Sequence, residues 1–224
     1  MSYVIADNRS WRPQMAENLA ARTRAHFHKI NSPDELTAEN LTRLGIRRIF
    51  LPHWSYRIPD AVYSQFDCIV FHMTDVPYGR GGSPLQNLIA RGIYETKISA
   101  LKCTASLDAG PVYMKRALSL HGSAEEIYIR ASAVIEDMIA QIIATSPEPV
   151  EQQGEAVVFR RRTPEEGNIT ELSDLRQIYD YIRMLDAEGY PKAFLEVGPF
   201  KLEFRRAALT QDGILADVVI RRKE

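Results

Sequence analysis

Cysteine and long apolar runs are scarce in this sequence. Its 224 residues include only two cysteines, Cys68 and Cys103, which lie far apart and each within an apolar run. We therefore expect no disulfide framework and no CxxC metal site, and interpret both as reduced core residues. No stretch approaches the ~18 consecutive apolar residues of a membrane-spanning helix, and the first residues do not resemble a signal sequence. A cytoplasmic protein without a membrane partner is the expectation.

An excess of charge of either sign is also missing. The chain has 28 Lys and Arg against 29 Asp and Glu, for a formal net charge of -1. Such a chain has no global attraction for a phosphate backbone, so a nucleic-acid role would need a local basic patch. The sequence contains no spacing of His, Cys, Asp and Glu typical of a metal site, and no G-x-S-x-G nucleophile motif. We therefore expect no metal and no serine hydrolase.

The balance of 45% hydrophobic and 25% charged residues is that of a globular protein. Short β-branched runs alternate with amphipathic stretches, the pattern of a parallel sheet covered by helices on both faces. The first predicted helix spans 12–23, with Ser10 as its cap, and the second runs from about 33 to 45. The predicted strands of this region are 3–6, 26–30, 47–51, 68–71, 97–102 and 112–119.

Two prolines among polar residues, Pro147 and Pro149, mark a linker after a long helix that starts near Ser123. They divide the chain into a larger domain, residues 1–146, and a small subdomain, residues 147–224. The tail is predicted to be α+β, with one amphipathic helix over 174–187. Its expected strands are 156–159, 193–197 and 201–204.

The segment most informative about chemistry begins at His72, which ends a hydrophobic strand. A loop rich in proline and glycine follows, up to Pro84. Ligands of open α/β sheets bind at the carboxyl ends of strands, and a histidine there can transfer protons near neutral pH. A structural histidine followed by a turn is the alternative. Gly79-Arg80-Gly81-Gly82 matches neither a dinucleotide fingerprint nor a P-loop.

Asp108 lies downstream in the turn Asp108-Ala109-Gly110. An aspartate in such a place is most often a turn-forming residue. Together with the preceding segment, however, it forms an ordered pattern. His72, Pro77, Arg80-Gly81 and Pro84 resemble the H-x-S-L-L-P-x-x-R-G-x-x-P signature of the 10-formyltetrahydrofolate-dependent formyltransferases, and Asp108 resembles the aspartate of that family's D-x-G turn. Weaker matches to the family are 92–99, 123–127 and 159–165.

This resemblance implies a Rossmann-like formyltransferase fold of class α/β, with residues 1–146 as the catalytic domain. It also implies transfer of a formyl group from 10-formyltetrahydrofolate to a primary amine, without a metal. His72 would carry protons between the two nitrogens, and Asp108 would orient its ring and stabilise its protonated form.

One position departs from the family, which has an asparagine two residues before the histidine. Here that position is Val70, whose side chain shares a strand face with His72 but offers no hydrogen bond. Losing an oxyanion donor costs about 10²–10³ in rate. His53, after the neighbouring strand, is our candidate replacement. Its alternative role is a hydrogen bond to a loop carbonyl.

The resemblance also suggests binding residues. The predicted folate-binding residues are Trp54, Ser55, Pro77, Arg80, Gly81 and Thr104, and the predicted acceptor-binding residues are Asp75, Arg9 and Trp11. Each group has a structural alternative: Trp54 would pack in the core, Asp75 would cap a helix, and Arg9 and Trp11 would belong to the start of a helix.

The expected acceptor is an amino sugar in nucleotide-linked form, from a surface-polysaccharide or pseudaminic-type pathway. The short tail with interspersed acidic residues favours a small molecule over nucleic acid. Methionyl-tRNA is the alternative acceptor. Two different classes of protein stay open as well: a non-catalytic folate or sugar-nucleotide binding protein, and a folate-dependent hydrolase or one-carbon transferase of another type. A homodimer is one open oligomeric state.

Overall fold

The fold is given by a computed structural model, which describes residues 1–9 and 11–223. The predicted cap at Ser10 lies outside the described residues. The chain forms two compact units, and it passes between them several times. The first unit comprises Met1–Arg80, Lys97–Leu118 and Ile129–Val158, and the second comprises Gly81–Thr96, Ser119–Tyr128 and the chain from Phe159 onward. The division into domains 1–146 and 147–224 does not follow these units and stays a prediction.

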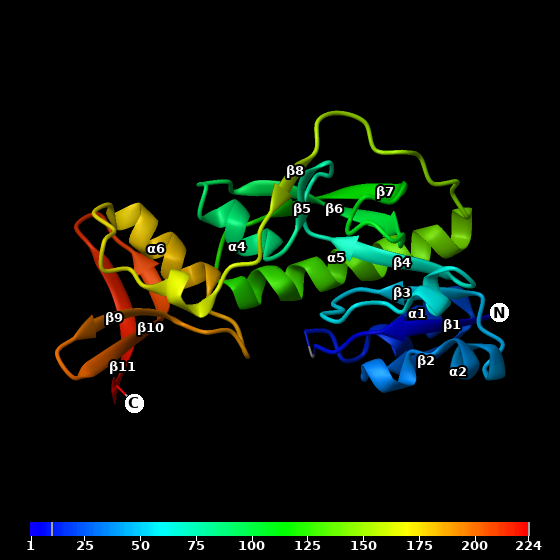
Figure 1. Ribbon diagram of the computed structural model, residues 1–224, viewed down its shortest axis with the longest axis horizontal. Helices are drawn as coiled ribbons and strands as arrows, with labels where there is room; N and C mark the ends of the chain where they lie inside the picture. The colour runs from blue at the N-terminus through cyan, green and yellow to red at the C-terminus, as the bar shows by residue number, and fades with distance from the viewer. Residues whose placement is uncertain (10, 224) are drawn as a thin grey trace. The chain divides into compact units, whose positions relative to one another are not determined.

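A six-stranded sheet contains every strand predicted for the first half of the chain, in the order β2-β1-β3-β4-β6-β7 (Figure 1). The strands β2, β1, β3 and β4 pair in parallel, and β6 pairs antiparallel with β4. The predicted mostly parallel sheet is therefore confirmed. The bounds are β1 Ser2–Ala6, β2 His26–Ile30, β3 Arg48–Leu51, β4 Asp67–His72, β6 Glu95–Lys102 and β7 Val112–Ser119.

The core follows from these strands, since parallel strands with both faces covered are apolar almost throughout. Val4, Ile49 and Ile69 have no exposed surface. The accompanying helices are α1 Met15–Thr23, η1 Pro33–Glu35, α2 Ala38–Arg43, α3 Asp60–Tyr63 and α5 Ala124–Thr145. The single helix predicted over 33–45 is wrong: η1 ends before Thr37, whose side chain caps α2 by accepting from the Asn40 amide.

The second unit contains an antiparallel sheet of order β11-β10-β9, and contacts join β10 to α6. This arrangement confirms the predicted α+β tail. Its elements are α4 Pro84–Ile89, η2 Pro164–Gly167, α6 Leu175–Met184, β9 Ala193–Val197, β10 Phe200–Leu209 and β11 Ile214–Arg222. Two further strands, β5 Tyr78–Gly81 and β8 Val157–Phe159, pair with each other.

The sheet register brings three loops to one edge. Ile5 pairs with Phe50 and Leu51 pairs with Val70, so β1, β3 and β4 all end at the same edge. The loops after them carry Arg9, His53 and Asp75. Because β6 is antiparallel to β4, it ends at the opposite edge, and the loop from 103 to 110 folds back to reach His72.

Candidate active site

His72, the last residue of β4, is the centre of the site and is only 7% exposed. Its ring Nε2 lies 2.7 Å from the Gly79 carbonyl oxygen, and its Nδ1 lies 3.4 Å from Asp108 Oδ2. Both ring nitrogens therefore face oxygen acceptors. A doubly protonated imidazole satisfies both contacts, whereas a neutral ring has only one N–H to donate. The structure brings the two predicted catalytic residues, His72 and Asp108, into contact.

The turn that carries Asp108 has a demanding backbone. Asp108 has φ +52°, in the left-handed region that few non-glycine residues adopt. A Cβ at Gly110 would lie 1.8 Å from the Lys102 carbonyl oxygen, so this close approach requires glycine. The Gln152 side-chain amide donates to the carbonyls of Asp108 and Gly110, at 2.9 and 2.8 Å.

The loop after His72 is also held by hydrogen bonds. The Thr74 hydroxyl donates to the Gly79 carbonyl at 3.3 Å, and buried Ser99 donates to the Thr74 carbonyl at 2.7 Å. Arg80 donates through Nε and Nη2 to Gln152 Oε1, at 3.0 and 2.8 Å. The carbonyl that accepts from His72 is thus fixed by several contacts.

The other predicted folate-binding residues of this region are spread over several segments. The Pro77 carbonyl accepts from the Val157 amide at 3.0 Å, and Gly81 follows Arg80 at the end of β5. Thr104, after β6, donates to the Ser106 carbonyl at 3.1 Å. None of these contacts tests a folate-binding role, which stays a prediction.

His53 lies after β3, and its ring is neutral at ordinary pH. Burial lowers the pKa of His53 to about 4, and the positive charge of Arg9 adds to this effect. Its Nε2 lies 2.7 Å from the hydroxyl of Ser132, a fully buried residue of α5. The last β3–β4 pair is Leu51 with Val70, so His53 lies in the turn that follows β3, at the edge of the sheet where β4 ends in His72. A catalytic role for His53 stays a prediction.

Trp54 packs against a core cluster to which the parallel strands and the helices α2 and α3 contribute, as the structural interpretation expects. Its indole Nε1 is buried and has no hydrogen-bond partner among the described residues. A buried N–H without an acceptor costs about 1–3 kcal/mol, so this atom is a candidate contact for a ligand. The next residue, Ser55, donates its backbone amide to Asn8 Oδ1 at 3.0 Å.

Asp75 forms ion pairs with two lysines, Lys115 at 2.5 Å and Lys97 at 2.8 Å. Burial raises the pKa of Asp75, but the hydrogen bonds and charges of the two lysines outweigh it and hold the pKa below its usual value. Its charge is therefore satisfied within the protein. A helix cap does not describe this residue, and a contact to an acceptor amine stays a prediction.

The loop after β1 contains a titratable group that the sequence did not single out. Burial raises the pKa of Asp7 to about 7, against the lowering effects of the Arg9 amide and the Arg9 charge. The Arg9 amide donates to Asp7 Oδ1 at 2.8 Å. Arg9 and Trp11 are partly buried here, and their predicted role in acceptor binding stays open to test.

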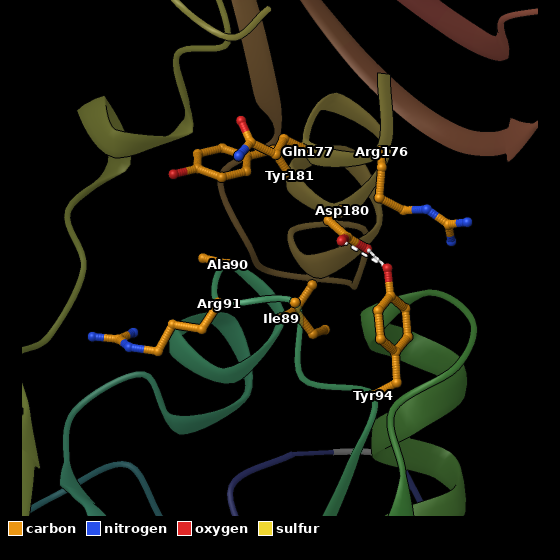
Figure 2. Close-up of a pocket in the computed structure, with 9 residues that line it drawn as sticks. Ile89, Ala90, Arg91, Tyr94, Arg176, Gln177, Asp180 and Tyr181 are labelled. Atoms are coloured by element: carbon orange, nitrogen blue, oxygen red, sulfur yellow. Dashed lines mark hydrogen bonds between the residues drawn. The ribbon is translucent and has the colours of Figure 1, made fainter. Parts of the chain in front are cut away.

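A cavity of about 330 Å³ lies in the second unit, and none of the predicted site residues lines it. Figure 2 shows Tyr94 directed at Asp180, to which its hydroxyl donates at 2.9 and 3.1 Å. Arg183 binds the same carboxylate at 2.6 Å. Arg91 and Arg176 point to opposite sides of the view, so their charges do not converge.

Among residues 1–9 and 11–223, no group of three or more His, Cys, Asp or Glu side chains is arranged to hold a metal ion. Within the same residues, the helices are too short or too polar to cross a bilayer.

Residues 164–221 match the family model of the methionyl-tRNA formyltransferase C-terminal domain. Among curated proteins, the chain is similar to the methionyl-tRNA formyltransferases of Dichelobacter nodosus (27% identity over 160 residues) and Gluconobacter oxydans (28% over 130 residues). These matches cover 68% and 57% of this chain but 49% and 42% of the relatives. The chain thus spans about half the length of the curated relatives it matches.

Among solved structures, one described as methionyl-tRNA formyltransferase from Clostridium thermocellum has 47% identity and a TM-score of 0.96, covering all of both chains. A sugar N-formyltransferase from Shewanella has a TM-score of 0.68 at 15% identity, covering 100% of this chain and 97% of its own. HypX from Aquifex aeolicus, in complex with tetrahydrofolic acid, has a TM-score of 0.78 at 17% identity, covering 99% of this chain and 44% of its own. The last two similarities concern the fold alone.

Proposed function

The chain belongs to the 10-formyltetrahydrofolate-dependent formyltransferase family, and from this premise we propose that it transfers a formyl group from 10-formyltetrahydrofolate to a primary amine. The observation that carries the proposal is the contact of His72 Nδ1 with Asp108 Oδ2, at 3.4 Å. The two residues match the family's motif in the resemblance described above; His72 ends β4, and Asp108 lies in the loop that follows β6.

In the proposed reaction the acceptor nitrogen attacks the formyl carbon, and a new C–N bond forms. The resulting tetrahedral intermediate breaks its bond to N10 of the folate. His72 takes the proton that the acceptor amine loses and returns it to the departing N10, so the protons balance. Asp108 and the Gly79 carbonyl stabilise the doubly protonated ring between these steps. During the transfer, one ring nitrogen of His72 must leave its contact with Gly79 or Asp108 and form a hydrogen bond with the substrate instead.

The folate is proposed to lie beside the segment that follows β3. The buried Nε1 of Trp54, which has no acceptor among the described residues, supports this location because a pterin presents nitrogen and oxygen acceptors. Pro77, Arg80, Gly81 and Thr104 are the further proposed contacts, carried over from the family resemblance.

Stabilisation of the intermediate's oxyanion is the step for which this chain lacks the family's asparagine. Val70 cannot donate a hydrogen bond, and His53 is proposed to do so. Two features support His53: burial lowers the pKa of its ring to about 4, which favours the neutral form, and it follows β3 at the edge where His72 ends β4. Its contact with Ser132 fixes the ring position.

Methionyl-tRNA is the acceptor that the relatives favour, since the 47% identical structure and the curated matches carry that name. The predicted amino-sugar acceptor and the predicted absence of a nucleic-acid partner are therefore unconfirmed. One observation keeps an amino sugar as the second candidate: residues 159–224 contain as many acidic as basic side chains. A tail of balanced charge offers little general attraction to tRNA.

The test is an assay of tetrahydrofolate release with three separate additions: methionyl-tRNA, nucleotide-linked amino sugars, and no acceptor. Release that depends on one acceptor, with a formylated product of matching mass, supports transfer and identifies the acceptor class. Release of formate without any acceptor would instead indicate a hydrolase. Binding of a folate analogue without turnover under any condition would indicate a non-catalytic protein.

A further inference from the structure

We propose that Gln152 is a positioning residue for the formyl transfer: its side-chain amide holds the turn of Asp108 against the loop of His72. The expected effect on the transfer rate rests on the proposed function, whereas the expected effect on the His72–Asp108 contact does not. Gln152 lies after α5, just beyond the predicted linker that contains Pro147 and Pro149.

All four hydrogen-bonding positions of the Gln152 amide are used. Its Nε2 donates to the carbonyls of Asp108 and Gly110, and its Oε1 accepts from Nε and Nη2 of Arg80. A primary amide has two donors and two acceptor lone pairs, so the group is fully satisfied. The pattern also fixes the amide orientation, because a flipped amide would place its oxygen against two carbonyls.

These contacts close a ring through the catalytic pair. His72 binds the carbonyl of Gly79, the residue before Arg80, and Arg80 binds Gln152. Gln152 binds the carbonyl of Asp108, and Asp108 returns to His72. The Gln152 amide therefore links the two loops that bring His72 and Asp108 into contact.

Gln152 itself is held in place by a nearby backbone pair. Val112 and Val150 each donate their amide to the carbonyl of the other, at 2.8 and 2.9 Å. This bridge fixes the chain two residues before Gln152 to the start of β7. The support matters because Asp108 has a positive φ, and such a turn persists only where its surroundings stabilise it.

The decisive experiment is ¹⁵N NMR of the histidine rings at a fixed pH, in the 224-residue chain without substrate. The signals of His72 are assigned by their absence in His72→Ala, and Asp108→Ala gives their positions when the carboxylate is missing. We expect Gln152→Ala to shift the His72 Nδ1 signal toward the Asp108→Ala position. The neighbouring, exposed Gln153→Ala is the matched control and should leave the signal unchanged.

The variant Gln152→Glu tests the donor function of the amide separately from its acceptor function. Its side chain has nearly the same size as glutamine, so it also controls for misfolding of Gln152→Ala. It keeps an acceptor for Arg80 but cannot donate to Asp108 and Gly110, so it should shift the His72 signal as Gln152→Ala does. Wild-type signals in both Gln152 variants would overturn the proposal.

In the transfer assay, the Gln152 variants should lose about 10–100-fold in kcat with KM for the folate changed less than threefold, since misplacement of a catalytic group mainly affects the chemical step. A loss confined to KM would overturn the positioning role. Should the wild type transfer no formyl group to any acceptor, the proposed function fails, and the NMR comparison still decides the role of Gln152.

Discussion

Among single residues, Val70 stands where the family resemblance places an asparagine, and His53 is the proposed compensation. We predict that His53→Ala lowers kcat about 10²–10³-fold, the usual cost of losing one oxyanion donor. Val70→Asn should raise the rate little in the wild type, because His53 already supplies a donor. In the His53→Ala background, Val70→Asn should raise kcat at least tenfold. Steady-state kinetics of the four proteins measures this coupling.

Equal effects of Val70→Asn in both backgrounds would contradict the compensation. Folate affinity serves as the control, because an oxyanion donor acts on the intermediate and should leave ground-state binding nearly unchanged.

Asp7 gives a prediction about pH and stability. Burial raises its folded-state pKa to about 7, from 3.8 in an unfolded chain. Between these values the folded protein binds the proton more tightly, so the contribution of Asp7 to the free energy of unfolding falls as pH rises from about 4 to about 7. Asp7→Asn should remove this fall, and at pH 8 it should be more stable than wild type by on the order of 2 kcal/mol.

Urea unfolding at pH 5 and pH 8 checks this prediction. The gain from Asp7→Asn should be larger at pH 8. An equal difference at the two pH values would show that Asp7 titrates alike in the folded and unfolded chains.

The sequence predicted His72 and Asp108 because a motif of fixed spacing surrounds them. It could not identify Asp7 or Gln152 in the same way. The pKa of Asp7 depends on burial, and the role of Gln152 depends on contacts with residues 42 to 72 positions away. Neither property leaves a local pattern.

Among the elements, every strand of the six-stranded sheet was predicted, because each is a compact apolar run. Two strands were missed for different reasons. β5 consists of Tyr78–Gly81, which is typical of a turn, and becomes a strand only by pairing with β8. β11 follows Asp212-Gly213, a pair typical of hairpin turns, but Asp217 interrupts its apolar residues, so no compact run marks the strand.

The turn between β6 and β7 gives a prediction at this scale. Gly110→Ala places a Cβ 1.8 Å from the Lys102 carbonyl, so the turn must move and take Asp108 away from His72. We expect a loss of stability of about 1–3 kcal/mol, the usual cost of overpacking, and a loss of transfer activity. Thermal unfolding and the transfer assay measure the two effects.

Gly213→Ala is the matched control. No atom lies within 4 Å of a Cβ built there, and its φ is not positive. This variant should keep both stability and activity. Wild-type activity in Gly110→Ala would contradict the account of the turn.

At the scale of the whole molecule, the antiparallel sheet of the second unit exposes apolar side chains on one face. Val197, Phe200, Val218 and Ile220 share this face by register and are 42–64% exposed. Exposed apolar side chains gathered on one face are typical of an interaction site, and a homodimer, which is one of the open oligomeric states, would cover them. Sedimentation equilibrium should therefore show a dimer of the wild type and a monomer of Ile220→Asp.

Arg221→Ala is the control for that measurement, because residue 221 lies on the opposite face of β11 and should leave the dimer intact. A wild type that sediments as a monomer at all concentrations would contradict the prediction.

In the proposed mechanism, one imidazole and one carboxylate together move the proton during formyl transfer. Single-turnover rates of His72→Ala and Asp108→Ala, with the acceptor that supports wild-type transfer, measure what each side chain contributes. Both variants should fold, bind the folate, and lose at least ~10²-fold in the transfer rate, whereas exposed His26→Ala should keep it. Retention of more than about a tenth of the wild-type rate in both variants would contradict the claim.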